Sequence, residues 1–219
     1  PNDTVAYLEL RADLPGDQRA KVGDILAKFP GFADQASLDA KIDEALDRIL
    51  DQADVSWTQD VKPWLAGELG LAVTSAAFDV SKLPALDPSN LDGADLGKAP
   101  DDGAVALVAV KDAAAAEAWI SKQAGGEQKT ETYAGGEITI VSGPGQSTMA
   151  WAVRDSVLFL GPEKAVKSAL DTGGSSTFAS SESFSAALET APNAYLGFGY
   201  VDMAAFIDAA MDAATTSDD

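Results

Sequence analysis

The sequence predicts an α+β domain in which an antiparallel sheet of about seven strands carries helices mainly on one face. Two observations support this fold class. Short segments of alternating apolar and polar residues are joined by brief turns, which is typical of antiparallel neighbours. Between them lie longer segments with the apolar spacing of amphipathic helices. The expected order is β-α-α-β-β-α-β-β-β-α-α-β-α in a single domain, 1–219, with a candidate sub-division near the acidic loop 81–103.

The first strand and the first two helices occupy the N-terminal part of the chain. Residues 4–10 alternate as a strand does. After a proline-glycine turn, a helix capped by Asp17 is expected to end at Pro30 and Gly31. A second helix is expected from near Ser37, and its apolar stripe consists of Leu38, Ile42, Leu46, Ile49, Leu50 and Ala53.

The rest of the chain alternates strands with shorter helices. Further strands are expected at residues 68–77, 104–110, 137–142, 148–153, 156–161 and 194–200. Further helices are expected after the capping residue Asp112, after Gly161 and Pro162, near Glu182, and after the capping residue Asp202. A tight hairpin turn at Arg154 and Asp155 is expected to join two of these strands.

The composition excludes several kinds of chemistry. The 219 residues include no cysteine and no histidine, which removes disulfides, thiolate chemistry and imidazole bases or ligands. The 35 acidic and 15 basic residues give a net charge of −20, which disfavours nucleic acid and anionic membranes as partners. Such a charge is typical of proteins that remain soluble in high salt or outside the cytoplasm. We expect no cofactor and no metal requirement for folding.

The acid-rich loop 81–103 is the segment that invites a metal site. An EF-hand register that starts at Asp87 fails, because its fifth position is Leu91. A looser site could be made by oxygen ligands, and its candidates are Asp87, Asn90, Asp92 and Asp95. The alternative interpretation is a solvated surface loop.

The familiar catalytic motifs are missing from the sequence, including the nucleophile elbow and the phosphate-binding loop. The glycine cluster at 143–148 is predicted to be a hairpin loop. The glycines within 197–202 are predicted to mark places where another backbone or a tryptophan comes close. If the protein were a carboxylate-dependent hydrolase, the first candidate acids would be Glu9, Glu68 and Asp79, which lie nearest to apolar strand positions.

Lys62, Pro63 and Trp64 form a stiff aromatic corner before the strand at 68–77. Such a corner could belong to a catalytic loop, or it could serve packing alone. The corner and other landmarks together resemble the bacterial domain of unknown function 3352 over nearly the whole chain. The landmarks are Pro1, Asp3-Thr4, Ala6-Tyr7, Asp17-Gln18, Lys28-Phe29-Pro30, Asp60-Val61-Lys62-Pro63-Trp64-Leu65, Gly67, Val110-Lys111-Asp112, Tyr133, Gly135, Ser183-Phe184 and Tyr200-Val201-Asp202.

This resemblance implies an extracytoplasmic protein, common in actinobacteria, that is anchored to the membrane through an N-terminal segment absent from this sequence. Many members are about twice this length, so the chain resembles one half of a longer member. The family has no assigned activity or catalytic residue. The resemblance therefore makes Lys62, Pro63, Trp64 and Gly67 a structural signature, in which Pro63 sets the direction of the chain and Trp64 is buried.

Three functions stay open at this point. The first is a non-catalytic module of the cell envelope that binds a protein, peptide or glycan partner of unknown identity. The second is a carrier for a lipid or another apolar ligand held between sheet and helices, and the third is the carboxylate-dependent hydrolase. A carrier needs large apolar residues around an empty interior, whereas a binding module has them packed or set in one exposed patch. With 41 alanines drawing the layers together, we expect a filled interior with Trp57, Trp64, Trp119 and Trp151 at least partly packed.

Overall fold

The computed structural model describes residues 3–11, 20–21, 24–25, 28, 35–75, 103–143, 148–171, 177–191 and 195–216. Its strands are β1 (Thr4–Arg11), β2 (Leu65–Thr74), β3 (Ala104–Val110), β4 (Glu127–Tyr133), β5 (Gly136–Ser142), β6 (Met149–Arg154), β7 (Val157–Pro162) and β8 (Gly197–Val201). Its α-helices are α2 (Gln35–Leu50), α3 (Ala113–Ala124), α4 (Glu163–Asp171), α5 (Glu182–Thr190) and α6 (Met203–Thr216). Short 3-10 turns lie at Asp51–Ala53 and Phe178–Ser180, and a π-helical turn lies at Trp57–Val61. None of the helices within the described ranges has the length and apolar character needed to cross a membrane.

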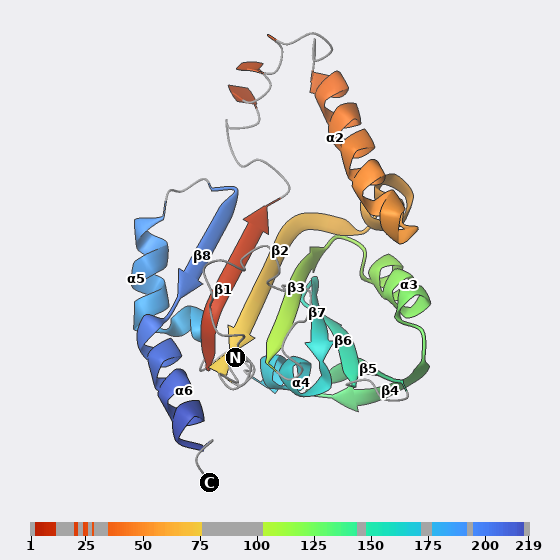
Figure 1. Cartoon of the computed structure of the whole chain (residues 1–219). Helices are drawn as coiled ribbons and strands as arrows, with labels where there is room; N and C mark the ends of the chain where they lie inside the picture. Colours follow the sequence, from red (N-terminus) through yellow and green to blue (C-terminus); the bar gives the residue numbers. More distant parts are fainter. Residues whose placement is uncertain are drawn as a thin grey trace.

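All eight strands form one sheet in the order β4-β5-β6-β7-β3-β2-β1-β8, and every neighbouring pair is antiparallel (Figure 1). The antiparallel α+β class predicted from the sequence is therefore confirmed. β2 and β3 are paired neighbours, although residues 75–103 separate them in the chain. β5 and β6 also pair directly, so the glycine-rich segment between them joins two hairpin strands, as predicted.

Helices pack against both faces of the sheet. β6 illustrates the division, because successive side chains of a strand point to opposite faces. Ala150 and Ala152 lie in a core with Val166 of α4. Trp151, between them, lies in a second core with Ile120 of α3. The two sides of the sheet are called here the α4 face and the α3 face. Helices therefore pack on both faces, whereas the sequence predicted them mainly on one.

Two hairpins use turns whose central residues have positive φ. Ala134 and Gly135 join β4 to β5 with φ of 48° and 82°. Asp155 and Ser156 join β6 to β7 with φ of 49° and 63°, one residue later than the sequence predicted. Turns of this hand match the right-handed twist of the strands that they connect.

Two elements differ from the sequence prediction. β4 was not predicted, because its residues are mostly exposed and show no apolar alternation; only its pairing with β5 makes it a strand. β2 begins at Leu65, three residues before the expected start at 68. Of the helix expected between Asp17 and Pro30, residues 20, 21, 24 and 25 are helical and residue 28 lies in a turn; the other residues lie outside the described ranges.

Candidate functional site

The aromatic corner before β2 is a packing element. Trp64 is 5% exposed, and its Nε1 donates a hydrogen bond to the carbonyl of Asp60 at 2.6 Å. Its ring lies 5.5 Å from that of Trp119 on α3. Gly67 has a φ of 105°, at the point where the β2–β3 register shifts. A glycine is needed there because other residues rarely adopt that conformation.

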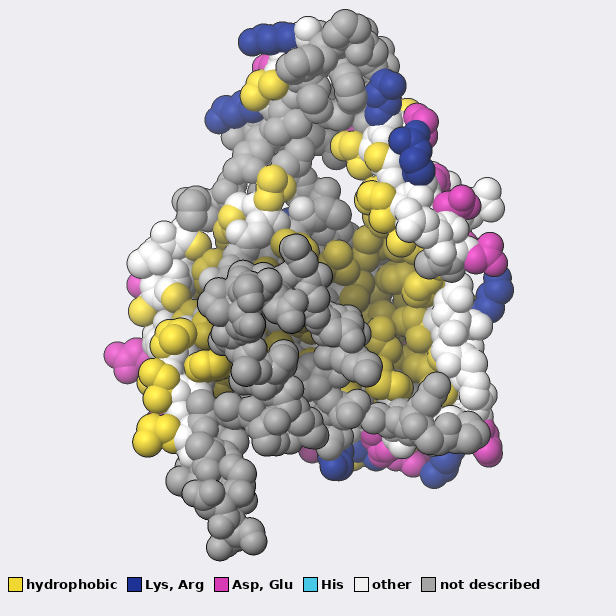
Figure 2. Space-filling view, in the orientation of Figure 1, with side chains coloured by type: hydrophobic (Ala, Val, Ile, Leu, Met, Phe, Trp, Pro, Cys, Tyr) yellow, Lys and Arg dark blue, Asp and Glu magenta, His cyan; other side chains and the backbone are white. Residues whose placement is uncertain are grey.

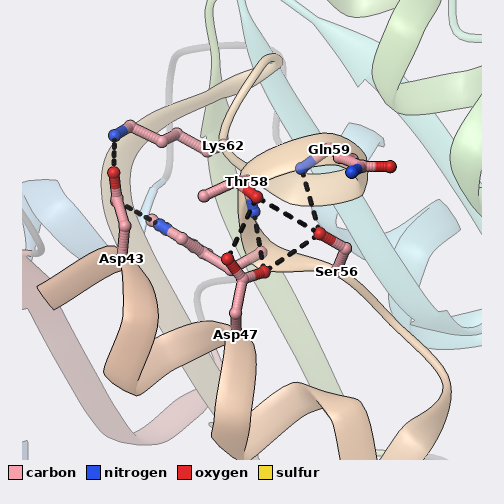
Figure 3. A network of polar contacts seen from close by, with 7 residues as sticks. Asp43, Asp47, Ser56, Thr58, Gln59 and Lys62 are labelled. Carbon is pink, nitrogen blue, oxygen red and sulfur yellow. Dashed lines mark hydrogen bonds and ion pairs between the residues drawn. The ribbon is translucent and has the colours of Figure 1, made fainter. Parts of the chain in front are cut away.

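A polar network ties α2 to this corner (Figure 3). Asp43 accepts hydrogen bonds from Trp57 Nε1, at 2.8 Å, and from Lys62 Nζ. One turn further along α2, Asp47 accepts bonds from the hydroxyl of Ser56 at 2.9 Å and from the backbone N–H and hydroxyl of Thr58 at 3.1 and 3.0 Å. Because Asp43 and Asp47 are four residues apart, both lie on the helix side that faces the corner.

The electrostatics of this network fit a structural role. The hydrogen bond from Lys62 holds the pKa of Asp43 below its ordinary value. Hydrogen bonds from Thr58 and Ser56 lower the pKa of Asp47 in the same way. Both carboxylates are thus acceptors that several donors of the corner hold in place. Lys62, Pro63, Trp64 and Gly67 show no arrangement that would activate a substrate.

An open acidic pocket of about 430 Å³ lies next to this network. It is lined by Asp47, Arg48, Asp51, Asp54, Val55, Ser56 and Asp60. Among the described residues, no group of three or more acids is placed to hold a metal ion. The four loop candidates Asp87, Asn90, Asp92 and Asp95 lie outside the described residues.

Two of the three candidate acids meet at one end of the sheet, on its α4 face. Arg11 Nε lies 3.0 Å from Glu9 Oε1 and 3.7 Å from Glu68 Oε1. Tyr7 and Tyr195 each donate a hydrogen bond to Glu9, at 3.2 and 3.1 Å. Glu9 is therefore held by one cation and two phenols, a set of contacts that stabilises a fixed carboxylate. Asp79 lies outside the described residues.

Aromatic side chains fill the α4 face beside this cluster. Phe184 of α5 is 6% exposed, and its ring lies edge-on to those of Tyr7, Phe198 and Tyr200 at 5.4 to 5.9 Å. Phe178 stacks 4.4 Å from Phe184. The predicted packing of the tryptophans is confirmed as well, since Trp64 and Trp151 are buried and Trp57 and Trp119 are partly buried.

The opposite, α3 face behaves differently over β1 and β2. Leu8, Leu10, Leu69 and Leu71 are 43%, 47%, 37% and 40% exposed. Leu8 pairs with Leu71 and Leu10 pairs with Leu69, so the four side chains form one contiguous patch, named here the leucine face. Beside α3, away from these four leucines, the sheet is hollowed and lined by further hydrophobic side chains (Figure 2). The leucine face is the candidate functional site, because four exposed leucines in one patch are unusual on a protein surface.

β8 leaves this patch open on one side. Gly199 is opposite Leu8 and Gly197 is opposite Leu10 in the β1–β8 ladder. A Cβ at Gly199 would meet no atom of the described residues within 4 Å. The prediction that these glycines accommodate a close backbone or tryptophan is therefore wrong for Gly199. At Gly197 an added Cβ would lie 3.2 Å from Cδ2 of Leu10 and 3.6 Å from the backbone oxygen of Glu9.

Sequence reasoning missed the leucine face. It recognised both strands by their alternation, but alternation alone does not show which apolar side chains will be covered by helices from distant parts of the chain. The available signal was the presence of leucines at alternate positions in two segments, Leu8 with Leu10 and Leu69 with Leu71.

The fold and this surface define an α+β domain built on one antiparallel sheet with an exposed apolar patch. The chain belongs to the family DUF3352, described as protein of unknown function, whose model matches residues 24–218. Searches of curated proteins and of solved structures find no match.

Proposed function

We propose that the protein is a non-catalytic module of the cell envelope that binds a protein or peptide partner through the leucine face. The observation that carries the proposal is the exposure of Leu8, Leu10, Leu69 and Leu71 in one patch on paired strands. Fully burying an exposed leucine side chain contributes about 1.5–3 kcal/mol, and these four are 37–47% exposed, so covering each would contribute roughly 0.5–1.5 kcal/mol to the affinity for a partner.

A protein partner fits the surface better than a glycan or an enclosed lipid does. Carbohydrate sites are commonly lined by exposed aromatic rings, whereas Trp64, Trp151 and Phe184 are buried. A carrier would surround its ligand with large apolar walls. The leucine face is instead a partly exposed patch on one side of a sheet, and apolar patches of this kind are typical of protein interfaces.

The charge of the chain indicates what the partner carries around its apolar centre. With a net charge of −20, the protein attracts basic surfaces and repels acidic ones. We infer a partner with an apolar contact region flanked by lysine or arginine. The same charge, with the resemblance described above, supports a location outside the cytoplasm and attachment through a membrane anchor.

Peptide selection on the immobilised chain tests this function. Peptides should be selected from a random display library on the wild-type protein, and one synthetic selected peptide should then be titrated against variants. Leu10→Lys should weaken its binding about ten- to hundred-fold, because a buried leucine contact is lost. Ile49→Lys is the matched control, because Ile49 is also an exposed apolar residue, at 63%, but lies on α2. Binding should also weaken as salt is raised.

Two outcomes would overturn the proposal. One is a set of selected peptides that bind Leu10→Lys and wild type equally. The other is stoichiometric retention of labelled palmitate by the wild-type chain with loss in Leu10→Lys, which would favour the carrier. The variants' unfolding curves should match that of wild type, since both replaced residues are exposed.

A further inference from the structure

The two outer strands of the sheet differ in charge. β4, at one end, carries Glu127, Lys129 and Glu131 within seven residues. β8, at the other end, has the uncharged sequence GFGYV. Charged residues on an edge strand discourage pairing with another chain. Its charged residues therefore protect β4 from pairing with another chain, whereas β8 has no charged residue to prevent such pairing.

The hydrogen bonds of β8 show which backbone groups point away from the sheet. Asp202 N donates to Val5 O, and Arg11 N donates to Leu196 O, both at 2.8 Å. In an antiparallel ladder the bonded pairs alternate, so Phe198 and Tyr200 also direct their N–H and C=O groups toward β1. The N–H and C=O groups of Gly197, Gly199 and Val201 consequently point outward. They have no protein partner among the described residues.

We propose that β8 pairs antiparallel with β8 of a second copy of this chain, with the two-fold axis beside Gly199. In this register Gly199 faces its own copy, and each Gly197 faces the partner's Val201. All three outward-pointing residues then form the bonded pairs of a new ladder. Phe198 comes opposite the partner's Tyr200 on the α4 face, and facing aromatic pairs stabilise antiparallel strands. The result is one sheet that runs through both copies.

The low charge of this edge is compatible with contact between two copies of the chain. Two chains of net charge −20 repel each other, so they can meet only where charge is low. Residues 195–207 contain a single charged residue, Asp202, and its carboxylate caps α6 by accepting a bond from Ala205 N at 3.0 Å. Exposed apolar side chains also occur on β8 and on the chain before and after it, namely Leu188, Leu196, Val201, Met203, Ile207 and Met211, which are 40–63% exposed.

Cysteine cross-linking tests the pairing and its register, because the chain has no cysteine of its own. Facing residues of a bonded antiparallel pair have Cα atoms about 5.5 Å apart, which is within disulfide range. Under mild oxidation, most of the Gly199→Cys protein should therefore become a covalent dimer. Leu8→Cys is the matched control, since Leu8 is exposed beside Gly199 but one strand further in. In the paired sheet, the two Leu8 positions lie about 14 Å apart, at about 4.8 Å per strand, which is too far to link.

The register has its own test. Gly197→Cys and Val201→Cys should link to each other in a mixture, whereas each alone should link poorly. Linking of Val201→Cys to itself faster than Gly199→Cys would overturn the register. The pairing would be overturned if Leu8→Cys and Gly199→Cys formed covalent dimers to the same extent. It would also be overturned if the wild-type chain sedimented as a monomer at every concentration up to that of the cross-linking experiment. Peptide binding at the leucine face does not depend on these results, because Leu10→Lys and Gly199→Cys alter different strands.

Discussion

The indole of Trp64 donates a hydrogen bond to the backbone carbonyl of Asp60 at 2.6 Å. This bond closes the π-helical turn Trp57–Val61 onto the first residues of β2, while the ring itself packs on Trp119. A single side chain thus joins the α2 corner, the sheet and α3. The aromatic corner therefore positions the Trp64 side chain for packing.

Replacing Trp64 by Phe should reduce the free energy of unfolding by about 1–3 kcal/mol, because a partly buried carbonyl loses its donor while most of the apolar ring is kept. Urea unfolding at neutral pH measures the change. Trp57→Phe is the comparison, since Trp57 is more exposed and its acceptor Asp43 keeps Lys62 as a partner. Equal losses in the two variants would contradict the structural importance given to Trp64.

The Asp43–Lys62 interaction should make stability depend on pH in the acid range. Because the pKa of Asp43 is lower in the folded chain than in the unfolded one, its contribution is present above about pH 4 and is lost as pH falls through the folded pKa. Asp43→Asn keeps an acceptor for Trp57 but lacks the charge. Melting temperatures of wild type should therefore exceed those of the variant at neutral pH and converge with them in acid. A constant difference at all pH values would refute this account.

Two glycine-to-alanine substitutions on the sheet should differ in how much they change the free energy of unfolding. At Gly161 of β7 an added Cβ would lie 2.6 Å from the backbone carbonyl oxygen of Ala104, so Gly161→Ala should destabilise by about 1–3 kcal/mol or more. At Gly199 it would meet nothing, so Gly199→Ala should change stability by less than about 1 kcal/mol. Urea unfolding at protein concentrations below those used for cross-linking compares the two. A large loss in Gly199→Ala would mean that the space beside Leu8 is filled.

Alkaline pH should destabilise the fold through Tyr7. Burial, followed by the nearby Glu9, raises the pKa of this phenol above its ordinary value of about 10. A raised pKa means that the stabilising contribution is complete below about pH 10 and is lost as pH rises further. Unfolding midpoints of wild type should fall from about pH 9 to about pH 11 more steeply than those of Tyr7→Phe. If the unfolding midpoints of wild type and Tyr7→Phe fell equally with pH, the raised pKa of Tyr7 would be contradicted.

Local patterns explain which elements could be predicted from the sequence. Asp112 and Asp202 accept bonds from backbone N–H groups three residues later, as their positions before two helices predicted. β3 has the predicted bounds, because a run of valine, leucine and alanine between turn residues is sufficient to mark a buried strand. β4 lacks any such pattern, and only its register with β5 makes it a strand.

The sequence by itself determined the antiparallel α+β class and the excluded chemistry, since each depends on composition or on residues close together in the chain. The burial of Trp64 was expected from the family resemblance. Only the tertiary structure decided which apolar positions remain exposed. Leu8 and Ala150 both occupy apolar positions of strands, yet one is 43% exposed and the other is fully buried. The difference depends on where helices from distant parts of the chain pack: α4 covers Ala150, whereas Leu8 lies on the part of the α3 face that keeps its leucines exposed. Burial is a property of long-range packing, so the leucine face could be recognised only in the folded molecule.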